Sequence, residues 1–417
     1  VAILGCDKES AAPAASSRPN VLLVTFDTTR ADFLSCYGRP DNTTPNIDAV
    51  AREGIRFANC YTPVPITLPA HATIMTGLYP FQHKLRDNGA GVLDEKAVTL
   101  AELFRDAGYR TGAFVGAYVL HSRYGLKQGF DVYSDEFKGI GARMEDGSEF
   151  AERRAQAVSE AALAWVGQKD DRPFFLWVHY FDAHAPYEPP GRAVGGDSPD
   201  AYAAEISYAD GEMGRVVRKI EELSKRTDRQ AWYVITADHG EGLGDHGEDT
   251  HGFFIYNTTV HVPLVIKGPG VQKTGVSDAI VSLIDIYPSI ARWLQLSLSY
   301  EVAGTELPLA PQSGGKARPF YFETIVPYRM YGWSPLEGWV VDREKLVSAP
   351  TAELYDLAVD PGETRDLASV RKDRTAELAA LLADVRKSSP GIPNLTVGKQ
   401  DADEASLQKL RSLGYVS

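Results

Sequence analysis

Cysteine is scarce in this sequence, with three residues in a chain of 417. Cys6 lies close to the start of the sequence, so only Cys36 and Cys60 remain for the folded part. Two cysteines cannot define a disulfide framework. A single bridge and two buried free thiols therefore both stay open. The length is sufficient for one large domain with a hydrophobic core and a smaller second domain.

The sequence also lacks a surplus of basic charge and any apolar run as long as a membrane span. The sequence contains 43 Lys and Arg residues and 56 Asp and Glu residues, which gives a net charge of -13. Nucleic-acid binding through a basic surface is therefore not expected. An anionic substrate is still compatible with this charge if a metal ion binds it.

The first six residues, Val1 to Cys6, resemble the end of a bacterial lipoprotein signal with Cys6 as the lipidated residue. The Ala-, Ser- and Pro-rich stretch 8–20 is typical of a flexible tether. We therefore interpret 1–19 as a signal remnant and tether, and the protein as exported to the periplasm or cell envelope. Membrane contact is expected only through a lipid anchor at Cys6. A chance apolar start is the alternative.

Alternating strand and helix patterns over 20–309 predict an α/β domain with a sheet between helical layers. Strands are expected at 21–26, 111–119, 174–178, 232–236 and 262–266. Helices are expected at 44–54, 100–107, 150–165, 201–223 and 279–294, the last with a kink or break at Pro288. A Pro-, Gly- and Lys-containing linker at 310–318 precedes a small α+β domain over 318–417. In that domain we expect short strands near 319–324, 338–342 and 345–348 and a closing helix at 374–387.

Thr67 stands immediately before a predicted helix, in the segment Thr67-Leu68-Pro69-Ala70-His71. Pro69 suits the first turn of a helix, and Gly77 is a natural stop. Thr67 has two interpretations, a helix N-cap or a nucleophile placed where free helix N–H groups attract an anionic ester.

Polar residues follow three of the predicted strands: Asp27 after the first, Asp182 and His184 after 174–178, and Asp238 with His239 after 232–236. In an open α/β sheet the carboxyl ends of strands lie along one edge, where ligands bind. Carboxylates, an imidazole and a hydroxyl make a divalent-cation site. Each residue alone is more often a cap or turn former, so the prediction depends on the whole set.

These residues lie in segments that resemble the sulfatase branch of the alkaline phosphatase superfamily. The matching segments are 26–32, 44–48, 67–80, 179–190, 237–242, 256–266, 354–357 with 360–361, and 410–416. The resemblance covers nearly all of the chain after position 20. It implies an alkaline-phosphatase-like mixed sheet between helices, with a small C-terminal α+β subdomain.

The chain departs from the sulfatase pattern at the nucleophile. Sulfatases have Cys or Ser, then x-Pro-x-Arg, and convert the first residue to formylglycine, whereas here Thr67, Pro69 and His71 occupy these positions. Oxidation of Thr would give a ketone rather than an aldehyde. The segment is instead similar to that of nucleotide pyrophosphatase/phosphodiesterases, and phosphoethanolamine and phosphoglycerol transferases also use Thr. Thr28 and His251 are further departures, where sulfatases often have Asp and Lys.

The resemblance implies a role for each residue of the site. Asp27, Asp238 and His239 would bind a divalent metal ion (Zn, Mn or Ca), with Thr67 as fourth ligand and nucleophile. His184 would contact the anionic oxygens or protonate the leaving group. His71 would support Thr67 or touch substrate, and Asn88 would donate to the substrate or merely form a turn. His251 is a further candidate catalytic residue. A second ion held by Asp182, His184 and His251 stays open.

From these features we expect a metal-dependent hydrolase of phosphate esters, foremost diesters, with an anionic ester as its partner. A transferase that passes a phospho-headgroup to an acceptor would share the first half-reaction. A sulfate ester hydrolase that works without formylglycine is the third reading. A catalytically silent binding module is disfavoured, because Asp27, Thr67, Asp238 and His239 are all present.

Overall fold

The computed structural model describes residues 18–89, 91–137, 152–191, 196, 198–313 and 318–398. Cys6 and the segment 410–416 lie outside the described residues, so export and lipid anchoring stay predictions. Within the described ranges, no helix combines the length and the apolar character that a bilayer crossing requires. Cys36 and Cys60 are free thiols.

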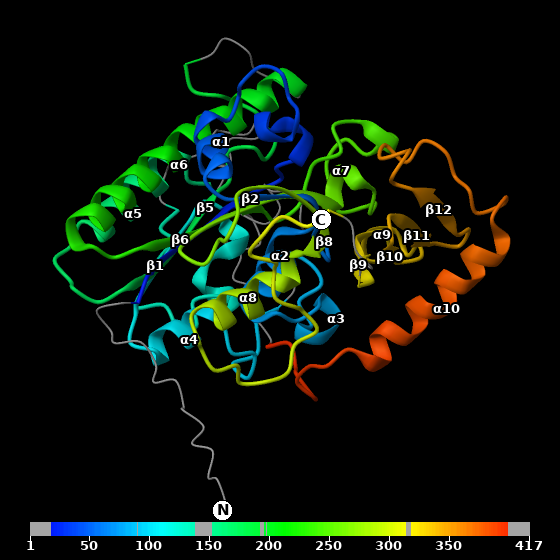
Figure 1. Ribbon diagram of the computed structural model, residues 1–417. Helices are drawn as coiled ribbons and strands as arrows, with labels where there is room; N and C mark the ends of the chain where they lie inside the picture. The colour runs from blue at the N-terminus through cyan, green and yellow to red at the C-terminus, as the bar shows by residue number, and fades with distance from the viewer. Residues whose placement is uncertain are drawn as a thin grey trace, which may run out of the picture.

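The centre of the molecule is an eight-stranded mixed sheet with the order β4-β3-β5-β1-β6-β7-β2-β8 (Figure 1). Its strands are β1 (Asn20–Phe26), β2 (Ile55–Tyr61), β3 (Arg110–Val115), β4 (Val132–Ser134), β5 (Phe174–Tyr180), β6 (Ala231–Ala237), β7 (His261–Lys267) and β8 (Gly275–Ser282). β7 pairs antiparallel with both of its neighbours, whereas the other pairs are parallel. β1 and β5 are buried on both faces, as their continuous apolar sequences predict.

Helices cover both faces of this sheet (Figure 1). An apolar cluster lies between the sheet and the helices on each face. One face carries α1 (Pro45–Arg52), α5 (Ala155–Val166) and α6 (Pro199–Thr227). The other carries α2 (Thr67–Thr76), α4 (Leu100–Asp106) and α8 (Ile286–Trp293). The mixed sheet between helices that we expected is therefore confirmed.

A second sheet is antiparallel, with the order β12-β11-β10-β9. Its strands are β9 (Phe320–Thr324), β10 (Leu336–Val341), β11 (Glu344–Ser348) and β12 (Glu353–Asp356), and α10 (Lys372–Ser388) packs on it. Three short helices are α3 (Pro80–His83), α7 (Asn257–Val260) and α9 (Val326–Tyr331). Single 3-10 turns lie at Ala31–Phe33, Ser35–Tyr37, Tyr118–Leu120, Ser122–Tyr124, Asp245–Gly247 and Leu283–Asp285. The C-terminal α+β unit is thus present, and Tyr79 and Ile284 of the large unit join its core.

The structure corrects three of the expected elements. The helix expected at 279–294 begins only at Ile286, because residues up to Ser282 continue as β8 beside β2. Pro288 then falls in the first turn of α8, where a backbone N–H has no partner to lose, so it breaks nothing. α5 begins at Ala155 rather than at 150, and β3 ends at Val115 rather than at 119.

Candidate active site

The site lies where three adjacent parallel strands end. β1 lies between β5 and β6 in the sheet, so the residues that follow these strands meet at one edge. Asp27 follows β1, and Asp238 follows β6. The Thr28 N–H donates to Asp238 Oδ1 at 3.2 Å, which ties the two strand ends together.

Asp27, Asp238 and His239 each offer a ligand atom within 4.8 Å of the other two, and all three side chains are completely buried. Burial raises the pKa of Asp27, and burial together with the charge of Asp27 raises the pKa of Asp238. Two acids that repel each other away from water are stable as carboxylates only beside a positive charge.

The described chain leaves these carboxylates largely unsatisfied. Both Asp27 oxygens and Asp238 Oδ2 are buried without a well-formed hydrogen bond. Buried polar atoms in folded proteins normally have partners. A divalent cation would supply the missing charge and accept these oxygens as ligands, so the residues fit the metal that the sequence predicted.

His239 is arranged as a ligand. Its Nδ1 lies 2.9 Å from the carbonyl oxygen of Gly240, so Nδ1 carries the proton and Nε2 keeps its lone pair. Burial, followed by the charge of His251, lowers the pKa of His239 well below its usual value. The neutral ring points this lone pair toward the Thr67 hydroxyl, 3.3 Å away.

Thr67 is the first residue of α2 rather than its N-cap, which is Ile66. The interpretation of Thr67 as a capping residue is therefore wrong, and its hydroxyl faces the acids instead. The expected free N–H groups are also largely absent: Leu68 N–H donates to Asn88, Ala70 N–H donates to Ile66, and Pro69 has none. Anion binding at this helix start cannot rest on those N–H groups.

His71 supports Thr67 and does not face a substrate. Its Nδ1 lies 2.8 Å from the Thr67 carbonyl oxygen, and its Nε2 lies 2.9 Å from the Thr25 hydroxyl. The ring is completely buried, and burial with the neighbouring His179 lowers its pKa well below the usual value. Both nitrogens are used, so of the two expected roles only support of Thr67 is compatible with the geometry.

His179, in β5, is a site residue that the sequence reasoning missed. Its Nε2 lies 3.2 Å from Asp27 Oδ2, and its ring packs edge-on against His71. Burial lowers its pKa to about 3, so the ring is neutral. The sequence did offer one signal for this residue: a histidine stands next to the last position of an otherwise apolar strand, close to the sheet edge where the site was expected.

Asn88 reaches the site from the loop after α3. Its Oδ1 accepts the Leu68 N–H at 2.9 Å, while its Nδ2 is buried without a partner among the described residues. Asn88 is therefore more than a turn residue. Its amide holds the start of α2 with one end and leaves a donor on the other.

The His251 ring lies beside the rings of both His239 and His184. His251 Nδ1 lies 3.1 Å from Glu241 Oε1, and the His251 ring centroid lies 4.5 Å from that of His239 and 5.2 Å from that of His184. Burial lowers the pKa of His251, but Glu241, with the charges of Asp27 and Glu248, outweighs burial and raises it to about 9. Burial and the charge of His251 lower the pKa of His184 to about 3. His251 is the cationic ring and His184 the neutral one, and Glu241 is a second residue that the sequence reasoning missed.

Asp182 does not join this cluster, which corrects the version with a second ion. Its Oδ1 accepts the Ala155 N–H at 3.1 Å and pairs with Arg154 Nε at 3.2 Å. A carboxylate already neutralised by an arginine has little attraction for a second cation. Asp182 fixes the start of α5 instead.

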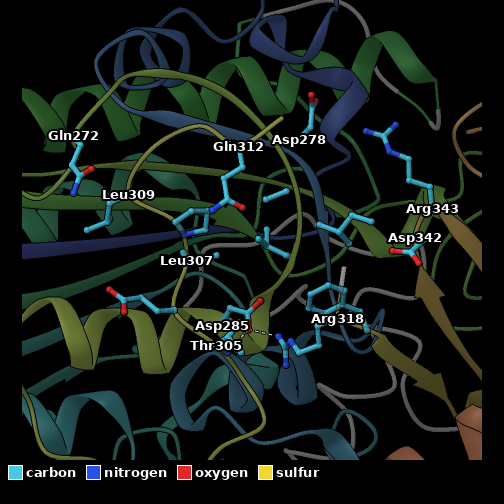
Figure 2. A pocket seen from close by; sticks show the side chains of 16 residues that line it. Gln272, Asp278, Asp285, Thr305, Leu307, Leu309, Gln312, Arg318, Asp342 and Arg343 are labelled. Carbon is cyan, nitrogen blue, oxygen red and sulfur yellow. Dashed lines mark hydrogen bonds and ion pairs between the residues drawn. The ribbon is translucent and has the colours of Figure 1, made fainter. Parts of the chain in front are cut away.

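A separate cavity of about 650 Å³ lies between β8, the segment 305–312 and the small sheet (Figure 2). Its wall includes the ion pair of Asp285 with Arg318, and Arg343 stands at another side. None of the predicted site residues lines it.

Comparisons with known proteins identify the family of this chain. The sulfatase family model matches residues 19–296. The chain belongs to the sulfatase family. This family is a branch of the alkaline phosphatase superfamily, so the resemblance seen in the sequence is confirmed, and the chain is a sulfatase-like hydrolase of ester bonds.

Among its relatives, an N-acetylglucosamine-6-O-sulfatase of Bacteroides thetaiotaomicron is 30% identical, over 89% of this chain and 87% of the relative. An uncharacterized sulfatase of Escherichia coli K12 is 27% identical, over 84% and 83%. The structure of a phosphonate monoester hydrolase of Agrobacterium radiobacter superposes with a TM-score of 0.72 at 22% identity, covering 89% of this chain and 96% of that one. This last similarity shows the shared fold.

Proposed function

We propose that this chain hydrolyses sulfate esters at a metal centre held by Asp27, Asp238, His239 and the Thr67 hydroxyl. The observation that carries the proposal is the convergence of two unsatisfied buried carboxylates with a histidine lone pair and a hydroxyl, in a sulfatase-family chain. The preference for sulfate over phosphate differs from our first expectation. It rests on relatives that are mostly sulfatases.

A bound divalent ion would neutralise the sulfate oxygens and lower the pKa of a hydroxyl in contact with it. The chain's own residues do the rest. Asn88 Nδ2 donates to a sulfate oxygen, and the Thr67 hydroxyl positions the attacking water. The water oxygen bonds to sulfur as the bond from sulfur to the alcohol oxygen breaks, and it releases one proton to solvent, which leaves hydrogensulfate. His251, held cationic by Glu241, donates the proton from Nε2 to the departing alcohol. His184, which is neutral, orients the ester, so of the two roles expected of it the proposal keeps contact with the anionic oxygens and gives the acid role to His251.

A phosphorus ester is the second candidate, and one observation favours it. Thr67 cannot form the aldehyde that makes sulfated enzyme easy to hydrolyse, yet its Oγ1 lies at the site beside His239 Nε2. With a phosphodiester, Thr67 Oγ1 would lose its proton to solvent and attack phosphorus, and one alcohol would leave with the proton of His251. Thr67 would then carry the remaining phosphoryl ester until water released it. An added alcohol that raised turnover would indicate a transferase.

The test is a rate comparison on one leaving group. Metal-replete protein would be given 4-nitrophenyl sulfate, 4-nitrophenyl phosphate, bis(4-nitrophenyl) phosphate and a 4-nitrophenyl phosphonate. We expect kcat/KM to be highest for the sulfate. A preference for the diester, with phosphate found on the Thr67 peptide by mass spectrometry after rapid quench, would establish the second candidate instead.

Thr67→Ala distinguishes the two chemistries within the same assay. If Thr67 positions water, we expect sulfate turnover to fall by about 10- to 100-fold and not to vanish. If Thr67 is the nucleophile, the entire covalent pathway disappears. Metal content measured by elemental analysis on the same preparation controls for loss of the ion.

A further inference from the structure

Two residues of the C-terminal unit hold the loop that carries Asn88. Arg329, in α9, pairs with Asp87, and its Nη1 lies 2.9 Å from Asp87 Oδ2. Glu323, in β9, pairs with Arg86, and its Oε1 lies 2.5 Å from Arg86 Nε. Both residues that directly precede Asn88 in the chain are therefore attached to the C-terminal unit by ion pairs.

The C-terminal side of these pairs is itself held in place. Glu323 is completely buried, its Oε2 accepts the Tyr321 hydroxyl at 2.6 Å, and its N–H donates to the Pro63 carbonyl oxygen at 2.9 Å. Val326, in the first turn of α9, packs on the apolar residues on either side of Thr67. β9 and α9 thus have a defined position relative to both Thr67 and the loop of Asn88.

Asp87 connects α9 to Asn88 through a single carboxylate. Its Oδ2 faces Arg329, while its Oδ1 accepts the backbone N–H of Asn88 at 2.8 Å. The Asn88 side chain in turn reaches α2, where Oδ1 accepts the Leu68 N–H at 2.9 Å. Nδ2 of the same amide is buried and has no partner in the described part of the chain. The direction of this donor therefore depends on how the loop places the Asn88 backbone.

Arg329 also keeps Asp87 in the form that bonds best. The Asp87 side chain is only 17% exposed. Burial raises the pKa of Asp87, and the charge of Arg329 opposes that rise. Without Arg329 the carboxyl group would take up a proton or turn toward solvent, and in both cases its hydrogen bond to the Asn88 N–H would weaken.

We propose that Arg329, acting through Asp87, is a positioning residue that orients the Asn88 amide toward the acid oxygens of the ester. This inference rests on the proposed function, in which Asn88 Nδ2 donates to those oxygens. It gives the C-terminal unit a part in the reaction, although its arginine acts only through Asn88. A catalytic donor loses much of its effect when its position shifts by a fraction of an ångström.

The test is a double-mutant cycle on kcat/KM, measured with whichever 4-nitrophenyl ester the wild type turns over fastest. We expect Asn88→Ala to lower kcat/KM about 100-fold, as the loss of one oxyanion donor does. Arg329→Met should lower it about three- to tenfold in the wild type. In the Asn88→Ala background the same change should cost nothing further, because the amide that it orients is gone. Arg329→Lys should recover most of the loss, since the pair joins one nitrogen to one oxygen.

Arg371→Met is the matched control. Its side chain is 44% exposed, as is that of Arg329, and it pairs with Glu344 at 3.1 Å in the same unit. It should leave kcat/KM unchanged, and urea unfolding should give similar stabilities for the two Met variants.

Three outcomes would contradict the inference, and they can be told apart. An equal loss from Arg329→Met in both backgrounds would show a general structural effect and overturn the positioning role. No loss in the wild-type background would also overturn it, and both results would leave the proposed function intact. Normal turnover by Asn88→Ala would instead remove Asn88 from the proposed function, and the positioning role with it.

Discussion

Two groups of buried charged residues in this chain differ in whether their charge is neutralised by a neighbouring residue. In the C-terminal unit, Lys345 and Glu363 are completely buried and face each other at 2.6 Å. At the edge of the large sheet, Asp27 and Asp238 are equally buried, but the histidines that contact them, His71, His179 and His239, have pKa values lowered by burial and are neutral.

The difference separates a structural pair from a binding site. Lys345 also donates to Asn257 Oδ1, and Glu363 Oε2 accepts the Asn257 N–H, so this pair joins β11 to the start of α7 and cancels its own charge. Among the described residues, none that contacts Asp27 or Asp238 carries a positive charge. His251 acts on them only through the field of its charge. Burial of charged side chains therefore does not by itself indicate a function. A buried negative charge that no residue of the chain neutralises does indicate a site for a cation.

The largest effect is expected from Asp238→Asn, which removes half of the uncompensated charge. We expect the metal content to fall and kcat/KM to drop by about 10⁴-fold, because metal and substrate orientation are lost together. The metal-free protein should be no less stable, since one buried acid has gone. Elemental analysis, kinetics and urea unfolding check the three outcomes. Full metal occupancy in this variant would contradict the assignment.

Lys345→Met should show the opposite pattern. It leaves Glu363 buried without its partner, so we expect a loss of about 3–5 kcal/mol in the free energy of unfolding. The double variant Lys345→Met/Glu363→Gln should recover much of that loss, because no charge is then left buried. Urea unfolding measures both. Metal content per folded molecule should stay normal, and a loss of metal would show that the two clusters are coupled.

Metal removal sharpens the comparison further. If free metal is present at about 100 times its dissociation constant, its binding contributes about 2.7 kcal/mol to stability. A chelator should therefore lower the melting temperature of the wild type and of Lys345→Met, measured by calorimetry. Asp238→Asn should respond far less. An equal response in all three proteins would place the metal elsewhere.

The smallest effect concerns pH. The pKa of His251 is about 9 and lies above its ordinary value, because Glu241, with the charges of Asp27 and Glu248, favours the protonated ring over the effect of burial. The proton that leaves with the alcohol is present below that pH, so kcat should fall about tenfold per unit as the pH rises above about 9. The stability that this group adds is complete below pH 6.5 and is lost as the pH rises from there through about 9. In Glu241→Gln the upper limb of the kcat profile should move to lower pH, and an unmoved limb would remove His251 from the acid role.

Much of the fold was predictable because its signals are local. The apolar sequences of β1, β5 and β6 need only their neighbours in the chain to be recognised, and so do Pro45 and Pro69 in helix first turns and Gly77 at a helix end. The prediction failed at 279–294, where an amphipathic sequence satisfies both a strand and a helix. Pairing of β8 with β2, more than 200 residues away, decided between them.

The site was predictable to a lesser degree. Asp27, Asp238 and His239 follow from strand ends and from the family pattern. Asp182 has the same sequence signature, yet Arg154 neutralises it. His179 and Glu241 were missed because their importance lies in contacts with Asp27 and His251, which no spacing along the chain reveals.

The sequence by itself determined the order of β1, β3, β5, β6 and β7 and of the main helices between them, the family, and the residue types that a cation site requires, because each depends on local periodicity or on short motifs. It did not reveal β2, β4 or β8. Only the tertiary structure decided which histidines are neutral, which carboxylates have partners, and that Thr67 faces the site rather than caps α2. These properties arise from burial and from hydrogen bonds between residues as far apart as Thr28 and Asp238. The free energy of a charge depends on what surrounds it in space and not on its neighbours in the chain.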